Sequence, residues 1–518
     1  MNDNNDKNNN VEDKFKTKTI INNIIIPSLI TLAILCYIFF LFQDKSNSGD
    51  SVIASNDPSE YGYTDPDQLN IYYGIIEPEY RHPDQPNNDY NRAFKYDSEF
   101  NYLKAIEYYK KSLEANIKQT NNQYDLDNGK IQLSLGNAYT KSALYDEAIE
   151  CYNNAIVVFE KNDDSLLVSA SYNGIGTIYS NLGKYDEALE YLNKAISIRE
   201  EKLGKDHPDT ALSYTYLAFA YQNQGDYKNA LALYEKSLAI DEKVWGKEHS
   251  NTTTTYNNIA GVYLDQGDYS KSLEWYEKAL TINEKVLGKN HQDTSVTYYN
   301  MANVYYYQGD YDKALAWYEK SLAIDKKIWG KNHPDIAATN YSIAMVYHDQ
   351  GDYDKALEWY EKSLAIDEKI WGKDHLNTSY TYYHIATVYH DQGDYDKALE
   401  WYEKALAIRE KVLGKDHLDT AYTYHSIAIV YHDKGDYNKA LEWYKKALVV
   451  KEDVLGKDHL ETAYTYYCIA LAYHFQDYGN EALEWYEKAL PIFEEELGKD
   501  HTDTISVLES IAMIKEEV

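Results

Sequence analysis

Apolar residues recur with a helical period in the segment Gly372–Leu413. Tyr382, Ile385, Ala386 and Tyr389 fall at i, i+3, i+4 and i+7, which places them on one face of a helix. The spacing therefore predicts an amphipathic helix that buries this face.

A turn and a second helix are predicted directly afterwards. Gly393 can end the first helix in the left-handed conformation, and Asp394 can cap the next helix. The apolar positions of that second helix are Ala398, Leu399, Tyr402, Ala405 and Leu406. Because Ala386 and Ala398 are small, the two helices can approach closely and pack as an antiparallel pair.

The same unit returns every 42 residues. Its turn glycine occurs without slippage at Gly183, Gly225, Gly267, Gly309, Gly351, Gly393 and Gly435. The small residue of the second helix marks ten pairs, at Ala105, Ala148, Ala188, Ala230, Ser272, Ala314, Ala356, Ala398, Ala440 and Ala482. A period of this size is typical of a stacked array. The sequence thus predicts an all-α superhelical solenoid of about ten antiparallel helix pairs over residues 91–518, with regular units over about 162–498.

Both ends of the array depart from the pattern, as the exposed ends of a stack should. A polar insert around 119–129 follows the irregular first pair, and Asp477 replaces the turn glycine of the last pair. The segment Thr504–Glu517 reads as a single C-terminal capping helix, with Lys515 where tyrosine would otherwise be buried.

The repeat resembles a known family. The tetratricopeptide pattern W-x2-L-G-x2-Y…A-x3-F corresponds here to Tyr382-x2-Ile385-Ala386-x2-Tyr389…Ala398-x3-Tyr402. The 42-residue period and the linker 414–420, GKDHLDT, are similar to the kinesin light chain type of this repeat.

The N-terminal residues have a different composition. Residues 1–19 form a polar tail, and residues 20–42 contain the uncharged run Ile24–Phe42, long enough for a transmembrane helix. Lysines are concentrated before the run, so an uncleaved signal anchor is predicted, with a cytoplasmic N-terminus and repeats outside the cytoplasm. A cleavable signal peptide and cytoplasmic repeats are the alternatives. Residues 43–90, rich in Asp, Asn, Ser and Pro, read as a flexible linker.

Charge and cysteine content add two limits. The formal net charge of −33 argues against nucleic acid as a partner, because phosphate binding needs basic patches. The array would hold Cys151 and Cys468 far apart, so no disulfide between them is expected.

No catalytic motif accompanies the repeat, so the sequence predicts a protein that is not an enzyme and needs no cofactor. One histidine stands in each linker, at His207, His249, His291, His333, His375, His417, His459 and His501. Histidines one repeat apart are too distant to share a zinc ion, which excludes a metal site of that kind. Their expected role is hydrogen bonding in the turn between repeats.

The face of the first helix opposite the packing stripe carries the candidate site. An amphipathic helix should be plainly polar there, but tyrosine, histidine and asparagine recur instead. The predicted groove residues are Asn257, Asn258, Tyr299, Asn300, Asn303, Tyr341, His348, Tyr380, Tyr383, His390, Asp391, Tyr422, His425, His432, Asp433, Tyr464, Tyr467 and His474. Tyrosine is enriched at binding hot spots, which favours a concave binding surface. The alternative is that neighbouring first helices pack together and bury these rings.

The resemblance implies a function in binding. Kinesin light chains bind cargo peptides through such a groove, but this chain lacks their N-terminal coiled coil and regular basic groove residues. We therefore expect a non-enzymatic, membrane-anchored scaffold, tethered through residues 20–42, that binds a protein or peptide in a Tyr/His/Asn-lined groove. The alternative is a structural protein that acts through self-association of the solenoid.

Overall fold

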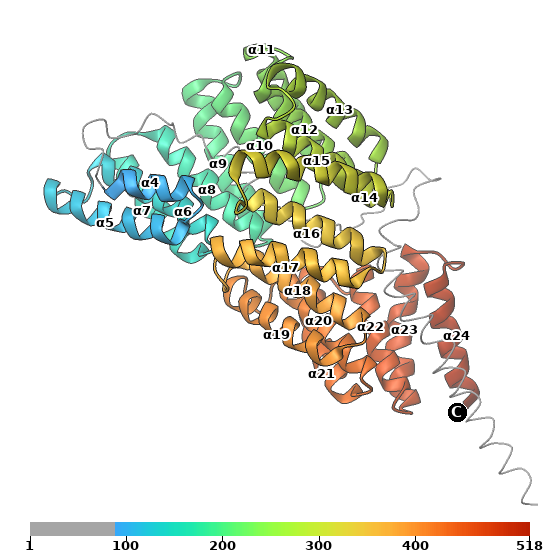
Figure 1. Ribbon diagram of the computed structural model, residues 1–518. Coiled ribbons are helices and arrows are strands. Elements are labelled where there is room, and N and C mark those ends of the chain that lie inside the picture. The colour runs from blue at the N-terminus through green and yellow to red at the C-terminus, as the bar shows by residue number, and fades with distance from the viewer. Residues whose placement is uncertain (1–88, 518) are drawn as a thin grey trace, which may run out of the picture.

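The computed structural model describes residues 89–517, and every regular element in this range is an α-helix (Figure 1). The first helices of the pairs are α4 (Asp89–Ser98), α6 (Leu126–Lys141), α8 (Ser165–Asn181), α10 (Pro208–Asn223), α12 (Ser250–Asp265), α14 (Gln292–Tyr307), α16 (Pro334–Asp349), α18 (Leu376–Asp391), α20 (Leu418–Asp433) and α22 (Leu460–His474). The second helices are α5 (Tyr102–Thr120), α7 (Tyr145–Lys161), α9 (Tyr185–Leu203), α11 (Tyr227–Val244), α13 (Tyr269–Val286), α15 (Tyr311–Trp329), α17 (Tyr353–Ile370), α19 (Tyr395–Val412), α21 (Tyr437–Val454) and α23 (Gly479–Glu496). A single helix, α24 (Thr502–Glu517), follows them. The described residues thus confirm the predicted all-α array of ten pairs and a closing helix.

The turn within each regular pair follows from two adjacent residues. In the pair α18–α19, Gly393 has φ +79°, the left-handed conformation that glycine adopts without a steric cost. The next residue, Asp394, accepts a hydrogen bond at 3.4 Å from the backbone N–H of Lys397 and so caps α19. Both predicted roles are confirmed.

The two helices of a pair meet through the predicted small residues. Ala386 of α18 and Ala398 of α19 are both fully buried, and Tyr382 and Tyr402 beside them are 6% and 3% exposed. Each pair also packs against the next pair, so the core runs along the whole array. This arrangement is that of a solenoid, in which stability comes from contacts between neighbouring repeats.

The last helix is a cap of mixed character. Val507 and Ile514 of α24 are buried, whereas Ile505 and Leu508 are 40% and 39% exposed. Lys515 is exposed, as predicted, and its Nζ lies 3.4 Å from a carboxylate oxygen of Glu487.

The predicted tail 1–19 and the predicted membrane segment 20–42 lie outside the described residues, as does the linker 43–90 except for its last two residues, which belong to α4. No helix within residues 89–517 has the length and apolar character needed to cross a membrane. The predicted localisation as a single-pass membrane protein is corrected accordingly, because the helices that the structure describes are amphipathic and bury their apolar faces against one another.

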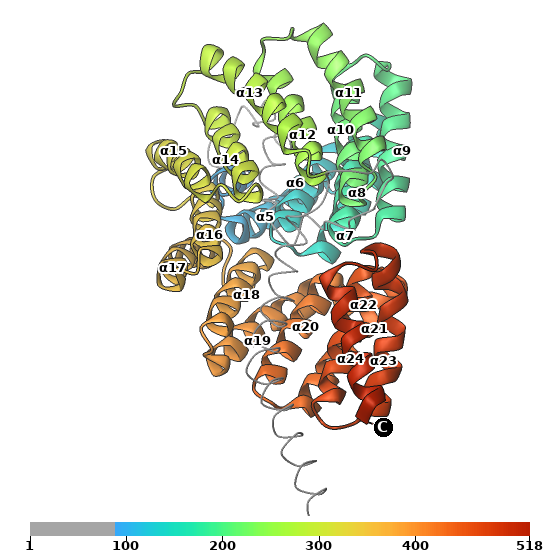
Figure 2. The ribbon, with the colours of Figure 1, turned by 90° about the vertical axis from the view of Figure 1, so that its right-hand side faces the viewer.

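The pairs wind into a superhelix whose N-terminal end meets a later part of the array (Figures 1 and 2). The hydrophobic core formed by α4–α8 also includes Leu376 of α18, and Tyr380 and Leu413 pack against it. The superhelical turn is therefore closed by contacts between distant repeats.

Candidate functional site

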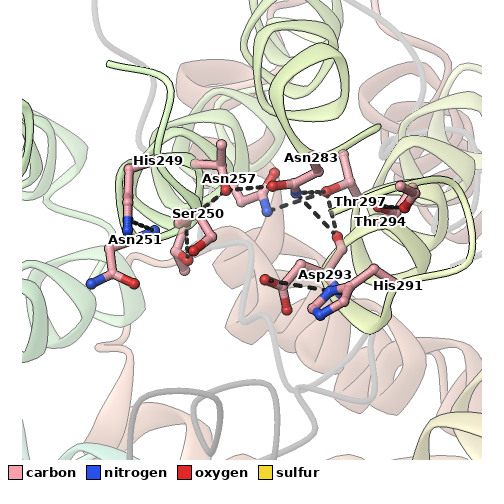
Figure 3. A network of polar contacts seen from close by, with 12 residues as sticks. His249, Ser250, Asn251, Asn257, Asn283, His291, Asp293, Thr294 and Thr297 are labelled. Carbon is pink, nitrogen blue, oxygen red and sulfur yellow. Dashed lines mark hydrogen bonds and ion pairs between the residues drawn. The ribbon is translucent and has the colours of Figure 1, made fainter. Parts of the chain in front are cut away.

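The linker histidines cap the first helices. The ring Nδ1 of His249 accepts a hydrogen bond at 3.1 Å from the backbone N–H of Asn251, and His291 does the same for Asp293 at 3.2 Å (Figure 3). The other six make the equivalent bond, at His207, His333, His375, His417, His459 and His501. The predicted role in the turn between repeats is confirmed, and it requires an unprotonated Nδ1.

Asn257 belongs to a buried polar network between α12, α13 and α14 (Figure 3). Its side-chain Nδ2 donates to Thr297 Oγ1 at 3.4 Å. Asn283, which is fully buried, donates to the same oxygen at 3.3 Å and accepts from Thr253 Oγ1 at 2.8 Å. Asn257 therefore joins consecutive repeats.

Asn258 and Asn300 differ from Asn257 in having free amides. They occupy the same position of α12 and α14, one repeat apart, and both are partly exposed. Neither makes a hydrogen bond to another described residue. Nearby, Asn303 Oδ1 accepts a hydrogen bond from the Tyr318 hydroxyl at 2.5 Å. Asn258 and Asn300 thus place free amides at equivalent positions of two consecutive first helices.

Most predicted tyrosines contact the next first helix. The hydroxyls of Tyr299 and Tyr383 lie 3.0 Å and 2.8 Å from Ser342 Oγ and Ser426 Oγ, each one repeat further on. Tyr341 is 2% exposed, and its ring packs edge-on against the ring of His384 of α18, with centroids 5.2 Å apart. These rings stabilise the stacking of repeats.

The remaining tyrosines also have partners nearby. Tyr380 and Tyr464 donate hydrogen bonds of 2.7 Å and 2.6 Å to Asp419 and Asp503. Tyr422 lies against the ammonium of Lys451, 4.8 Å from the ring centre. Tyr467 is 7% exposed.

A chain of histidines and aspartates connects α16, α18 and α20. His348 Nε2 lies 2.7 Å from Asp391 Oδ2, and the other oxygen of Asp391 lies 3.2 Å from His390 Nδ1. His390 Nε2 then lies 2.8 Å from Asp433 Oδ2. Since both nitrogens of His390 face carboxylates, both carry protons and the ring is a cation.

The electrostatics of this chain agree with its geometry. Burial alone would lower the pKa of His390, but hydrogen bonds to Asp391 and Asp433 outweigh it and raise that pKa to about 9. Burial would raise the pKa of Asp391, but His348 and His390 lower it to about 2. These histidines and aspartates therefore form a buried ionic network, in which the imidazole of His390 is not free.

This ladder of histidines and aspartates ends in the next two repeats. His432 Nδ1 lies 3.4 Å from Asp433 Oδ1, and the His432 ring packs edge-on against Phe475. His425 lies against Tyr444, and burial lowers its pKa well below the usual range. His474 is partly exposed beside Phe475 and Tyr486.

A row of buried polar residues on the second helices was not predicted. It comprises Arg199, Asp241, Asn283, Asp325, Asp367, Arg409 and Lys451, one per repeat and each at most 9% exposed. Arg409, for example, donates to Thr423 Oγ1 at 3.0 Å and lies 4.7 Å from the centre of the Tyr383 ring. The signal that could have found them is a polar residue recurring at one position of an otherwise apolar stripe.

The predicted groove residues therefore differ in what the structure leaves available. The tyrosines and histidines mostly join neighbouring first helices, while Asn258 and Asn300 keep free amides. Within residues 89–517, no group of three or more His, Cys, Asp or Glu side chains is placed to hold a metal ion. The binding role of the eighteen predicted residues remains a prediction.

The chain belongs to the tetratricopeptide repeat family. The model of this repeat matches residues 127–201, 167–243, 251–327, 335–411, 380–453, 419–480 and 461–517, together more than half of the chain. A second tetratricopeptide model matches residues 299–369, and a Sel1 repeat model matches residues 98–117. The predicted tetratricopeptide repeats are thus confirmed, and their 42-residue period resembles that of the kinesin light chain type.

Solved structures with similar repeats cover parts of the chain. A putative kinesin light chain from Podosopora anserina with nearly identical repeats is 28% identical and covers 38% of this chain and 94% of its own, with a TM-score of 0.31. BtubC from P. vanneervenii is 21% identical over 45% of this chain and 91% of its own, with a TM-score of 0.36. A Rap protein complexed with competence and sporulation factor is 18% identical over 71% and 97%, with a TM-score of 0.46. No curated protein matches the chain in sequence.

Proposed function

We propose that the chain is a non-enzymatic scaffold that binds a protein or peptide segment along the first helices of its repeats. Membership of the tetratricopeptide repeat family supports this class of function. The observation that carries the proposal is the pair of free amides at Asn258 and Asn300, which recur at one repeat position on α12 and α14. An amide offers both a donor and an acceptor, which suits the backbone of an extended segment.

The predicted tyrosine and histidine positions enter this proposal in a secondary role. Rings such as Tyr383 and His390 hold consecutive first helices at a fixed spacing through their contacts with Ser426 and Asp433. Between α12 and α14, where the free amides lie, the hydrogen bond from Asn257 to Thr297 joins the two first helices in the same way. The aromatic residues thus contribute to binding through the shape of the surface.

The test is affinity capture with the full chain, followed by identification of the bound proteins. Changing Asn258→Ala together with Asn300→Ala should weaken binding at least about tenfold, because each lost hydrogen bond is worth about 1 kcal/mol. Asn193→Ala, at an exposed asparagine of the second helix α9, is the matched control. Circular dichroism should show equal helicity in all variants. Identical partners and affinities in the double variant and the wild type would refute this binding surface.

Self-association is a second candidate because α24 exposes Ile505 and Leu508 side by side on its outer face. Such a face can be covered by a second copy of the chain. Sedimentation of the full chain over a range of concentrations tests this. A mass that rises with concentration, and that returns to the monomer value with Leu508→Glu, is expected; a constant monomer excludes it.

A further inference from the structure

The turns of the first two helix pairs lack the turn glycine, as does the turn of the last pair at Asp477. The position held by glycine in the regular turns is Phe100 in the first pair and Ala143 in the second, with φ +58° and +52°. A side chain in this left-handed conformation costs about 1 kcal/mol. Residues other than glycine at these two positions therefore suggest a compensating contact elsewhere.

The compensating contact is made with the ends of α16 and α17, which lie later in the array. The ring of Phe100 packs edge-on against the linker histidine His333, with centroids 4.6 Å apart. Next to it, Tyr102 stacks on Trp371 at the end of α17, with centroids 5.0 Å apart. Aromatic pairs of this geometry stabilise a contact beyond the area that they bury.

The second pair adds a hydrogen bond and an apolar contact. His375 Nε2 donates to the backbone carbonyl of Lys141 at 3.1 Å across 234 residues, between five and six repeats. Its Nδ1 is occupied by the cap bond from Asn377, so Nε2 carries the proton. Leu376 lies in the same core cluster as Ala143.

Equivalent residues of other repeats show what this closure covers. Trp245 occupies the same repeat position as Trp371, and the two side chains are 44% and 6% exposed. The side chain of the linker histidine His291 is 44% exposed, whereas that of His333 is 5% exposed. Burial of Trp371 and His333 thus accompanies the contact with the first two pairs and is not a property of the repeat.

We propose that these residues form a closing contact that holds the superhelical turn shut and can open without unfolding any repeat. The closing contact is defined as Phe100, Tyr102, Lys141 and Ala143 on one side, and His333, Trp371, His375 and Leu376 on the other. In a solenoid, each repeat is stabilised by its immediate neighbours, so a contact five repeats away is not needed for folding. Opening needs the separation of these residues, and of Tyr380 and Leu413 from the α4–α8 core, together with a small change of curvature spread over the intervening pairs.

The consequence for the molecule is a two-state superhelix. In the closed state, the first helices of the intervening pairs lie inside a closed superhelical turn. In the open state, the two sides of the closing contact are separated. For a partner bound on α12 and α14, opening would regulate entry, and this last step alone rests on the proposed function.

The test uses Phe100→Gly, which removes the ring but restores the glycine of the regular turn and relieves its strain. Combined with Trp371→Ala, it should raise amide hydrogen exchange in residues 371–376 about tenfold, equivalent to about 1.4 kcal/mol, and increase the maximum dimension in small-angle X-ray scattering. Helicity should be unchanged. Trp245→Ala is the matched control and should alter neither measurement.

A photo-crosslinking amino acid at position 102 of the full chain provides a second measurement. It should form a crosslink to the 371–376 peptide that is lost with Trp371→Ala. Absence of this crosslink, unchanged exchange in the double variant, or loss of helicity in Phe100→Gly would each overturn the proposal. No binding partner is needed, so these outcomes are independent of the proposed function.

Discussion

At the scale of single residues, histidine serves two purposes in this chain, and hydrogen-bonding geometry separates them. The linker histidines accept a backbone N–H at Nδ1, as His375 does, and must be neutral there. In the ladder, His390 faces a carboxylate from each nitrogen and is charged. Protonation is therefore unfavourable at His375 and favourable at His390.

The capping histidines predict a loss of stability in acid. Burial lowers the pKa of His333 and of His375 from 6.5 to about 4 in the folded chain, although the Lys141 carbonyl opposes the shift at His375. The neutral caps therefore stabilise the fold fully above about pH 6.5, and this contribution is lost as the pH falls toward about 4. The limit for each histidine is about 3 kcal/mol.

Chemical unfolding at pH 7 and pH 4.5 measures this effect. In the variant His333→Asn, His375→Asn, the caps no longer titrate, so its free energy of unfolding should fall less between the two pH values than that of the wild type. His291→Asn controls for replacing a capping histidine as such. An equal fall in the wild type and the double variant would contradict the assignment.

At the scale of helices and turns, much could be predicted because it depends on residues close in sequence. The stripe of Tyr382 and Ala386, the glycine turn at Gly393 and the histidine linkers are local patterns, and the structure confirms them. The environment of Tyr383 depends on Ser426 of the next repeat and on Arg409 of the intervening helix, which no local pattern reveals. From the local pattern, Tyr383 was expected on a binding surface because it lies opposite the packing stripe. In the structure its hydroxyl contacts Ser426, so the ring lies between two first helices.

The turn glycines give a prediction at this scale. Gly393 has φ +79°, and a Cβ atom added to it would meet nothing within 4 Å, so its only function is conformational. Gly393→Ala should lower the free energy of unfolding by about 1 kcal/mol, measured by urea denaturation. Gly393→Asn should cost less, because asparagine tolerates the left-handed conformation better. A loss for asparagine larger than that for alanine would contradict this explanation.

At the scale of the whole molecule, curvature determines which repeats meet. The 42-residue period predicted the number of helix pairs, but the small rotation from one pair to the next sets where the turn closes. The rotations of the intervening repeats add up to bring Lys141 next to His375. This contact therefore could not be predicted from one repeat unit. The irregular turn residues Phe100 and Ala143 were local signs of it.

The central functional claim is that a partner binds along α12 and α14, where amides remain free, and not along the aromatic and ionic ladder of α16–α22. Hydrogen–deuterium exchange of the full chain, with and without a captured partner, tests this most directly. The expected result is protection in α12 and α14 around Asn258 and Asn300. Protection confined to α18–α22, with α12 and α14 unchanged, would contradict the claim.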